Sequence, residues 1–198
     1  YAAEQRFRDY EMPFNADSQF WSGLGFLTRR PLRNARDVRN YIGLLRDVPH
    51  YFDQQIGTMR AGLARGLSVP RATLDGRDQP IAMVADLKDP EQSTFYDPLK
   101  KLPATIPAGE QAQLRAEARA AIRDAVIPAF AKRLVFFRGE YLPKARITLA
   151  AEAMPDGKAG YRGQIREYTT LDLSPDEVQA IGLREVASIR AEMDAIIE

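Results

Sequence analysis

The sequence predicts an all-α protein, a bundle-like array of about six to eight helices with proline-marked joints. Apolar residues recur every three or four positions along most of the chain, which is the spacing of one helix face. No segment shows sustained alternation of apolar and polar residues, and the best strand candidate, residues 146–151, fits a helix end equally well. The 13 prolines mark the joints, because a proline inside a helix removes a backbone donor and crowds the preceding turn.

The first helices are predicted from capping residues and prolines. Residues 1–11 are expected to end a helix, and residues 16–33 to form an ordered loop rich in aromatic side chains. Asn34 is expected to cap a helix that Pro49 breaks, with Pro49 serving as the first residue of the next helix. That next helix is expected to end at Gly66, because glycine readily adopts the left-handed conformation that follows many helices.

The middle of the chain is expected to combine short segments with one long helix. Short helical segments are predicted around residues 70–74 and 80–87, followed by an irregular stretch, residues 89–107, that contains four prolines. A long helix then begins near Pro107. Pro128 lies inside it and should kink or break it.

The last two helices have strong start signals. A turn at residues 155–157 is followed by a segment that could form a helix carrying Tyr161, Ile165 and Tyr168. Residues 174–177 then read Ser-Pro-Asp-Glu, which combines an N-cap, a proline at the first helical position and an acidic first turn. The final helix carries an apolar stripe made of Val178, Ile181, Leu183, Val186, Ile189, Met193 and Ile196.

The chain begins at Tyr1 without an initiator Met and stops inside the final helix without a stop signal. We therefore expect residues 1–198 to be either a single helical domain or the N-terminal fragment of a larger domain. The apolar stripe would then lie exposed, and we expect it to be available for a homodimer.

Composition excludes several kinds of chemistry. The absence of Cys and the presence of one His, His50, exclude disulfides, thiolate nucleophiles and every zinc site that needs cysteines or two histidines. A net charge of +1 provides no general field for nucleic acid, so no nucleic-acid partner is expected. The longest uncharged stretch, residues 18–28, is far shorter than the about 20 residues of a membrane-spanning helix. No catalytic residue and no metal ligand are predicted.

One stretch stands out as a candidate binding surface. Residues 161–170 place two tyrosines and two arginines shortly before the start of the final helix. A helix N-terminus with arginines nearby suits a substrate carboxylate. We therefore predict Tyr161, Arg166 and Tyr168 as substrate-binding residues. The alternative is an amphipathic helix whose tyrosines cover the core.

Several sequence blocks carry a resemblance to a known family. The stronger blocks are AMPDGKA at residues 153–159, YTTLDLSPDE at 168–177 and GLREV at 182–186. The weaker blocks are RDYEMPFN at residues 8–15, YFDQQI at 51–56 and FRGEYLPKAR at 137–146. In order and spacing they resemble the N-terminal half of the bacterial family called domain of unknown function eight-eight-five, over nearly the whole chain.

The resemblance implies a longer, largely helical bacterial protein that is periplasmic, exported or lipid-anchored. It also implies an H-E-x-x-H motif like that of zinc metallopeptidases in the later half, which this chain lacks. Zinc, the catalytic Glu and peptide hydrolysis would then belong to the remainder of the polypeptide, which would be this chain's partner. A cytoplasmic location stays open, because the absence of Cys suits both compartments. The alternative function is a self-contained helical binding or scaffold module without enzymatic activity.

Overall fold

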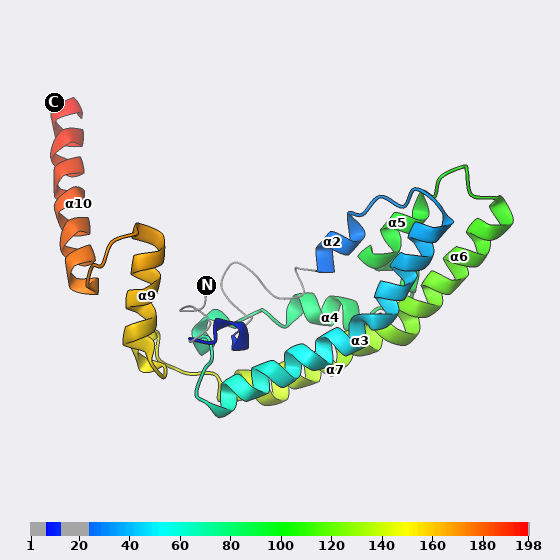
Figure 1. Cartoon of the computed structure of the whole chain (residues 1–198), viewed down its shortest axis with the longest axis horizontal. Coiled ribbons are helices and arrows are strands. Elements are labelled where there is room, and N and C mark those ends of the chain that lie inside the picture. Colours follow the sequence, from blue (N-terminus) through cyan, green and yellow to red (C-terminus); the bar gives the residue numbers. More distant parts are fainter. Residues whose placement is uncertain (1–6, 13–23, 198) are drawn as a thin grey trace. The chain divides into compact units, whose positions relative to one another are not determined.

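The computed structural model describes residues 7–12 and 24–197 (Figure 1). The chain divides into two units, which are described separately: unit 1 comprises Tyr1–Asp9 and Ala150–Glu198, and unit 2 comprises Tyr10–Leu149. Every regular element of the described residues is a helix, which confirms the predicted all-α class. Residues 146–150 contain no strand.

Unit 2 is built on α3, Ala35–Ala64, a helix of 30 residues. Its start is capped as predicted, because the side chain of Asn34 accepts a hydrogen bond of 2.9 Å from the backbone N–H of Asp37. Its end is also as predicted, since Gly66 follows it with a left-handed φ of 78°. Buried residues recur every three or four positions along the helix: Val38, Tyr41, Ile42, Leu45, Val48, Phe52, Ile56, Met59 and Gly62.

The predicted break at Pro49 is wrong, because Pro49 lies inside α3. A proline in a helix interior costs about 3 kcal/mol or more through the lost hydrogen bond and the crowded turn. The buried face nevertheless runs from Val48 to Phe52 and Ile56 without a change of register. Burial of each large apolar side chain contributes about 1.5–3 kcal/mol, so packing on both sides of the proline outweighs its cost.

The long helix predicted from residue 107 is present, but its proline joints take the form of π-helical turns. The segments in order are α6 (Ala108–Ala121), a π turn (Ile122–Val126), α7 (Ile127–Phe136), a second π turn (Phe137–Tyr141) and α8 (Leu142–Lys144). Pro128 and Pro143 each lie in the first turn after a π turn. A π turn re-routes the backbone hydrogen bonds, so the helical path continues through each proline rather than stopping.

The helices of unit 2 enclose one hydrophobic core. Helix α3 packs against α6, the first π turn and α7, and α4 (Gln79–Ala85) packs against α7 (Figure 1). At its centre the rings of Phe52 and Phe130 meet edge to face with centroids 5.0 Å apart. The buried guanidinium of Arg133 lies 4.8 Å from the centroid of Phe52. Burial lowers the pKa of Arg133, but an arginine starts from so high a value that it stays a cation.

Short helical turns fill the remaining connections of unit 2. The stretch 89–107, expected to be irregular, contains two 3₁₀ turns, Pro90–Gln92 and Thr94–Tyr96, and the short helix α5, Asp97–Lys100. The side chains of Asp89 and Ser93 cap the two turns, which explains why a proline-rich segment is locally regular.

The chain start was predicted to be a helix end and then an aromatic loop. The described part of residues 1–11 contains only the 3₁₀ turn Asp9–Glu11. Most of the predicted loop, residues 13–23, lies outside the described residues, and its described end forms the short helix α2, Gly25–Thr28. The segment predicted around residues 70–74 is the 3₁₀ turn Arg71–Thr73.

Unit 1 contains the 3₁₀ turn Ala151–Ala153 and the helices α9, Gly157–Thr169, and α10, Pro175–Ile197. Both helices begin where their start signals predicted. At α10 the backbone N–H of Ser174 donates to the Glu177 carboxylate at 2.7 Å, and the backbone N–H of Glu177 donates to the Ser174 hydroxyl at 3.2 Å. This reciprocal pair is the predicted capping box.

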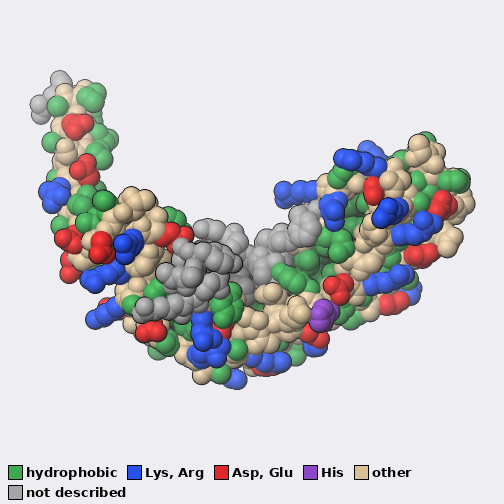
Figure 2. All heavy atoms as spheres, viewed as in Figure 1, with side chains coloured by type: hydrophobic (Ala, Val, Ile, Leu, Met, Phe, Trp, Pro, Cys, Tyr) green, Lys and Arg blue, Asp and Glu red, His purple; other side chains and the backbone are tan. Residues whose placement is uncertain are grey.

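Helix α10 buries none of its described residues. Hydrophobic side chains recur along its length (Figure 2). Two residues in the middle of the apolar stripe, Ile189 and Met193, are 53% and 55% exposed. None of the described helices is long and apolar enough to cross a membrane.

Candidate functional site

A large groove lies within unit 1, beside α9 and the start of α10. It has a volume of about 910 Å³. The side chains that give it chemical character are Glu152, Lys158, Tyr161, Arg162 and Asp176. A volume of this size is in the range of small-molecule sites, which is about 300–1,000 Å³.

Close backbone packing at Gly157 positions this groove. A Cβ atom at Gly157 would lie 2.0 Å from the carbonyl oxygen of Ala151, so only glycine allows the 3₁₀ turn to pack on the first turn of α9. This contact brings Glu152 to within 3.8 Å of Lys158. Tyr161 follows Lys158 by three residues and therefore lies on the neighbouring turn of the same helix face.

The groove combines both signs of charge. Glu152 and Asp176 are acidic, and Lys158 and Arg162 are basic. At the start of α10, hydrogen bonds from the backbone and hydroxyl of Ser174, reinforced by the charge of Arg162, hold the pKa of Glu177 below its ordinary value. The groove therefore presents fixed charges of both signs beside one exposed phenol, which suits binding of a polar ligand.

The structure separates the three predicted substrate-binding residues. Tyr161 lines the groove and is 45% exposed. Arg166 and Tyr168 lie on α9 outside the groove lining, and Tyr168 is 84% exposed. The groove's arginine is Arg162, which the sequence analysis did not select. The alternative in which both tyrosines cover the core is wrong, because Ile165 is the residue that this face buries.

Zinc does not fit the residues that the structure describes. Among them no three His, Cys, Asp or Glu side chains converge as a metal site would require. His50 lies on α3, where its ring Nε2 is 3.0 Å from the amide nitrogen of Gln54.

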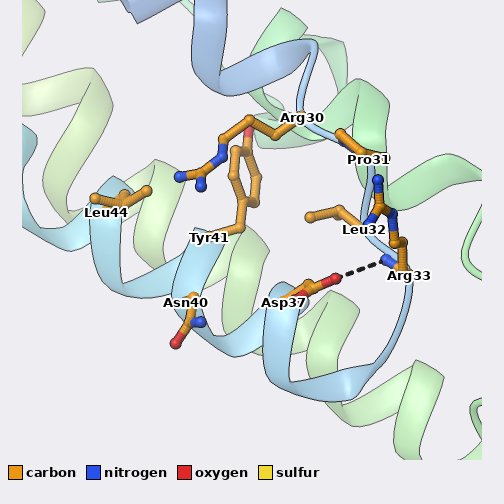
Figure 3. Close-up of a pocket in the computed structure, with 8 residues that line it drawn as sticks. All are labelled: Arg30, Pro31, Leu32, Arg33, Asp37, Asn40, Tyr41 and Leu44. Carbon is orange, nitrogen blue, oxygen red and sulfur yellow. Dashed lines mark hydrogen bonds between the residues drawn. The ribbon is translucent and has the colours of Figure 1, made fainter.

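A second hollow lies in unit 2, at the start of α3 (Figure 3). It has a volume of about 300 Å³, and its lining includes Arg30, Leu32, Arg33, Asp37, Tyr41 and Leu44. It was not predicted from the sequence. The available signal was a run of five arginines at positions 29, 30, 33, 36 and 39, crowded around one capping residue.

The described elements define an all-α protein, and the groove of unit 1 and the hollow of unit 2 are candidate sites on it. The family described as "Bacterial protein of unknown function (DUF885)" matches residues 2–198. The chain therefore belongs to this family, as the sequence blocks predicted.

One solved structure gives a wider view of the fold. It is a crystal structure of a putative lipoprotein from Colwellia psychrerythraea, with a TM-score of 0.81 and 22% sequence identity. The similarity covers 92% of this chain and 32% of the Colwellia chain, so this chain spans about a third of that protein's length. No curated protein matches the chain.

Proposed function

We propose that this chain is the amino-terminal helical part of a longer, exported peptidase-like protein, to which it contributes architecture and substrate contacts. The similarity to about a third of the Colwellia protein supports a longer polypeptide. The description of that protein as a lipoprotein supports export. Zinc and the hydrolytic residues belong to the remainder of the polypeptide in this proposal, as the family resemblance implies.

The uncovered apolar face of α10 is the observation that carries the proposal. A fully buried Ile, Val or Met side chain contributes about 1.5–3 kcal/mol, so covering the exposed half of one contributes on the order of 1 kcal/mol. The stripe offers several such residues in one line, including Val186, Ile189 and Met193. In this proposal the remainder of the polypeptide covers the apolar face of α10. The competing arrangement is a homodimer in which a second copy of the chain covers the same face.

The groove of unit 1 supports the proposed substrate contacts. A peptide carries amide groups and, at its ends, charges of both signs, and the groove presents Lys158 and Arg162 opposite in sign to Glu152 and Asp176. Tyr161 would contact such a substrate directly. Arg166 and Tyr168 extend the same helix and would contact the parts of a substrate that leave the groove.

The test compares the full-length protein with the 198-residue chain. Metal analysis and mass-spectrometric cleavage of a peptide mixture should show zinc and hydrolysis for the full-length protein and neither for the chain alone. Tyr161→Ala and Arg166→Ala in the full-length protein should lower kcat/KM, with Arg123→Ala, which changes an exposed arginine of unit 2, as the control. Unchanged kcat/KM in both test variants would remove the substrate-contact assignment, and a metal-free, inactive full-length protein would remove the peptidase.

A second candidate function is a self-contained helical binding module. The observation in its favour is that the hollow at the start of α3 lies within unit 2, whose helices enclose a hydrophobic core of their own. Sedimentation equilibrium distinguishes the two on the 198-residue chain. A stable monomer that binds a ligand as tightly as the full-length protein does supports the module. Self-association that Ile189→Glu abolishes shows instead that the apolar face of α10 has to be covered by another surface.

A further inference from the structure

Helix α9, which carries Tyr161 and Arg162 of the groove, is a weak helix by its own sequence. It has 13 residues, and its interior contains two glycines, Gly160 and Gly163. Glycine is the poorest helix former after proline, and isolated helices of this length are marginal in water even without it. Of the residues of α9, Gly157 and Ile165 alone are buried. The helix therefore depends on contacts with other segments of unit 1.

The two interior glycines form a notch that receives the ring of Phe7, a residue of the same unit. A Cβ atom at Gly160 would lie 3.3 Å from the Cδ1 of Phe7, and one at Gly163 would lie 3.2 Å from its Cε2. Both distances are shorter than the 3.4 Å at which ordinary van der Waals contacts of a Cβ begin. The ring therefore packs directly on the backbone of α9, which any larger residue at these positions would prevent.

The glycine notch lies on the side of α9 that is opposite to the groove. Lys158, Tyr161 and Arg162 line the groove, and their spacing of three and four residues places them on one helix face. At 3.6 residues per turn, Gly160 and Gly163 fall on the other side of the helix. The ring of Phe7 therefore supports α9 from behind and leaves the groove open.

We propose that Phe7 is a clamp on α9 and thereby a positioning residue for the groove. Docking of its ring in the glycine notch keeps α9 helical, and the helix holds Tyr161 and Arg162 on the groove side. Release of the ring lets α9 open locally, as segments with few buried contacts do, and the groove residues then separate. The functional meaning of the clamp rests on the proposed function of the groove, whereas the clamp itself can be tested without a substrate.

Amide hydrogen exchange of the 198-residue chain tests the clamp, with residues 161–169 as the readout and α3 as the internal reference. The variant is Phe7→Ala. Its matched control is Tyr10→Ala, which changes a nearby aromatic residue that is 51% exposed. Phe7→Ala should speed exchange of residues 161–169 by about tenfold and leave α3 unchanged, because α9 loses a large apolar contact. Tyr10→Ala should leave both unchanged.

A double-mutant cycle with Gly163→Ala tests whether the ring lies in the notch. In the Phe7→Ala background the added methyl group has room, and Gly163→Ala should slow exchange of α9 by about fivefold, the usual difference between glycine and alanine in a helix. In the unaltered chain the methyl group meets the ring, so the same substitution should slow exchange by less, or speed it. Gly182→Ala on α10, where a Cβ would meet nothing within 4 Å, should act equally in both backgrounds.

Three results would each overturn the proposal. The first is unchanged exchange of residues 161–169 in Phe7→Ala, and the second is an equal acceleration in α3, since Phe7 would then support the whole chain rather than α9. The third is an equal effect of Gly163→Ala in both backgrounds, because the ring would then not lie in the notch. Unchanged kcat/KM for Tyr161→Ala in the full-length protein would instead remove the substrate contact of Tyr161 and leave the clamp in place.

Discussion

Two glycines of α3 are expected to respond in opposite ways to the same substitution. A Cβ atom at Gly57 would meet nothing within 4 Å, whereas at Gly62 it would lie 2.8 Å from the carbonyl oxygen of Glu11 and 3.0 Å from its Cβ. Gly57→Ala should therefore stabilise the protein by about 0.5–1 kcal/mol, the usual gain from alanine in a helix interior.

Gly62→Ala has the same helical gain but a steric cost. Ordinary van der Waals contacts of a Cβ begin at 3.4 Å, so the Glu11 backbone would have to retreat by several tenths of an ångström. Glu11 cannot retreat freely, because its carboxylate is 2% exposed and accepts a 3.1 Å hydrogen bond from the Nε of Arg65. Overpacking of this kind costs about 1–3 kcal/mol. The net result should be a loss of about 1 kcal/mol, from the overpacking cost less the helical gain.

The measurement is urea unfolding of the 198-residue chain followed by far-ultraviolet circular dichroism. The midpoint should rise for Gly57→Ala and fall for Gly62→Ala, with the slope unchanged, since the slope reports exposed surface rather than stability. If Gly62→Ala raised the midpoint as much as Gly57→Ala, the close contact with the Glu11 backbone would not constrain the fold, and the reasoning would be refuted.

Two further predictions concern helix joints and pH. Pro49→Ala should stabilise α3 by about 1–2 kcal/mol, because the restored backbone hydrogen bond outweighs the restriction that the proline places on the unfolded chain. A lower urea midpoint for this variant would contradict the conclusion that packing offsets a cost of Pro49 inside α3. Because the pKa of Glu177 is lowered in the folded chain, its carboxylate should stabilise the start of α10 fully at pH values above the ordinary carboxyl pKa of 4.5. This stabilisation should be lost as the pH falls through the lowered pKa of Glu177. Amide exchange of residues 176–180 measured across this pH range should show the change in the unaltered chain, and Glu177→Gln should remove it.

Local chemistry made the helix boundaries predictable. The caps at Asn34 and Ser174 and the left-handed residue at Gly66 act over three or four residues, so the linear sequence contains all their partners. The same is true of the all-α class, because the apolar spacing of each segment is a property of that segment.

The effect of prolines was not predictable in the same way. Both Pro49 and Pro128 are predicted to interrupt a helix. In the structure Pro49 lies inside α3, and Pro128 lies in the first turn of α7, directly after a π turn. The deciding energies come from residues far along the chain, such as the contact of Phe52 with Phe130, and no local rule contains them.

The residues of the candidate sites could likewise be predicted only where they depend on local sequence. Tyr161 could be proposed from sequence because it lies near a recognisable helix start. That it shares a groove with Arg162 rather than Arg166 depends on the backbone contact between Gly157 and Ala151.

The sequence by itself determined the helical class, the caps, the absence of cysteine chemistry and the family. Tertiary structure alone decided that Arg30 and Arg33 share a hollow with Tyr41, because the hydroxyl of Tyr41 is held by the carbonyl of Phe95, 54 residues away. A site depends on such long-range contacts, whereas a helix start depends on its immediate neighbours, and this is the physical reason why one could be predicted and the other could not.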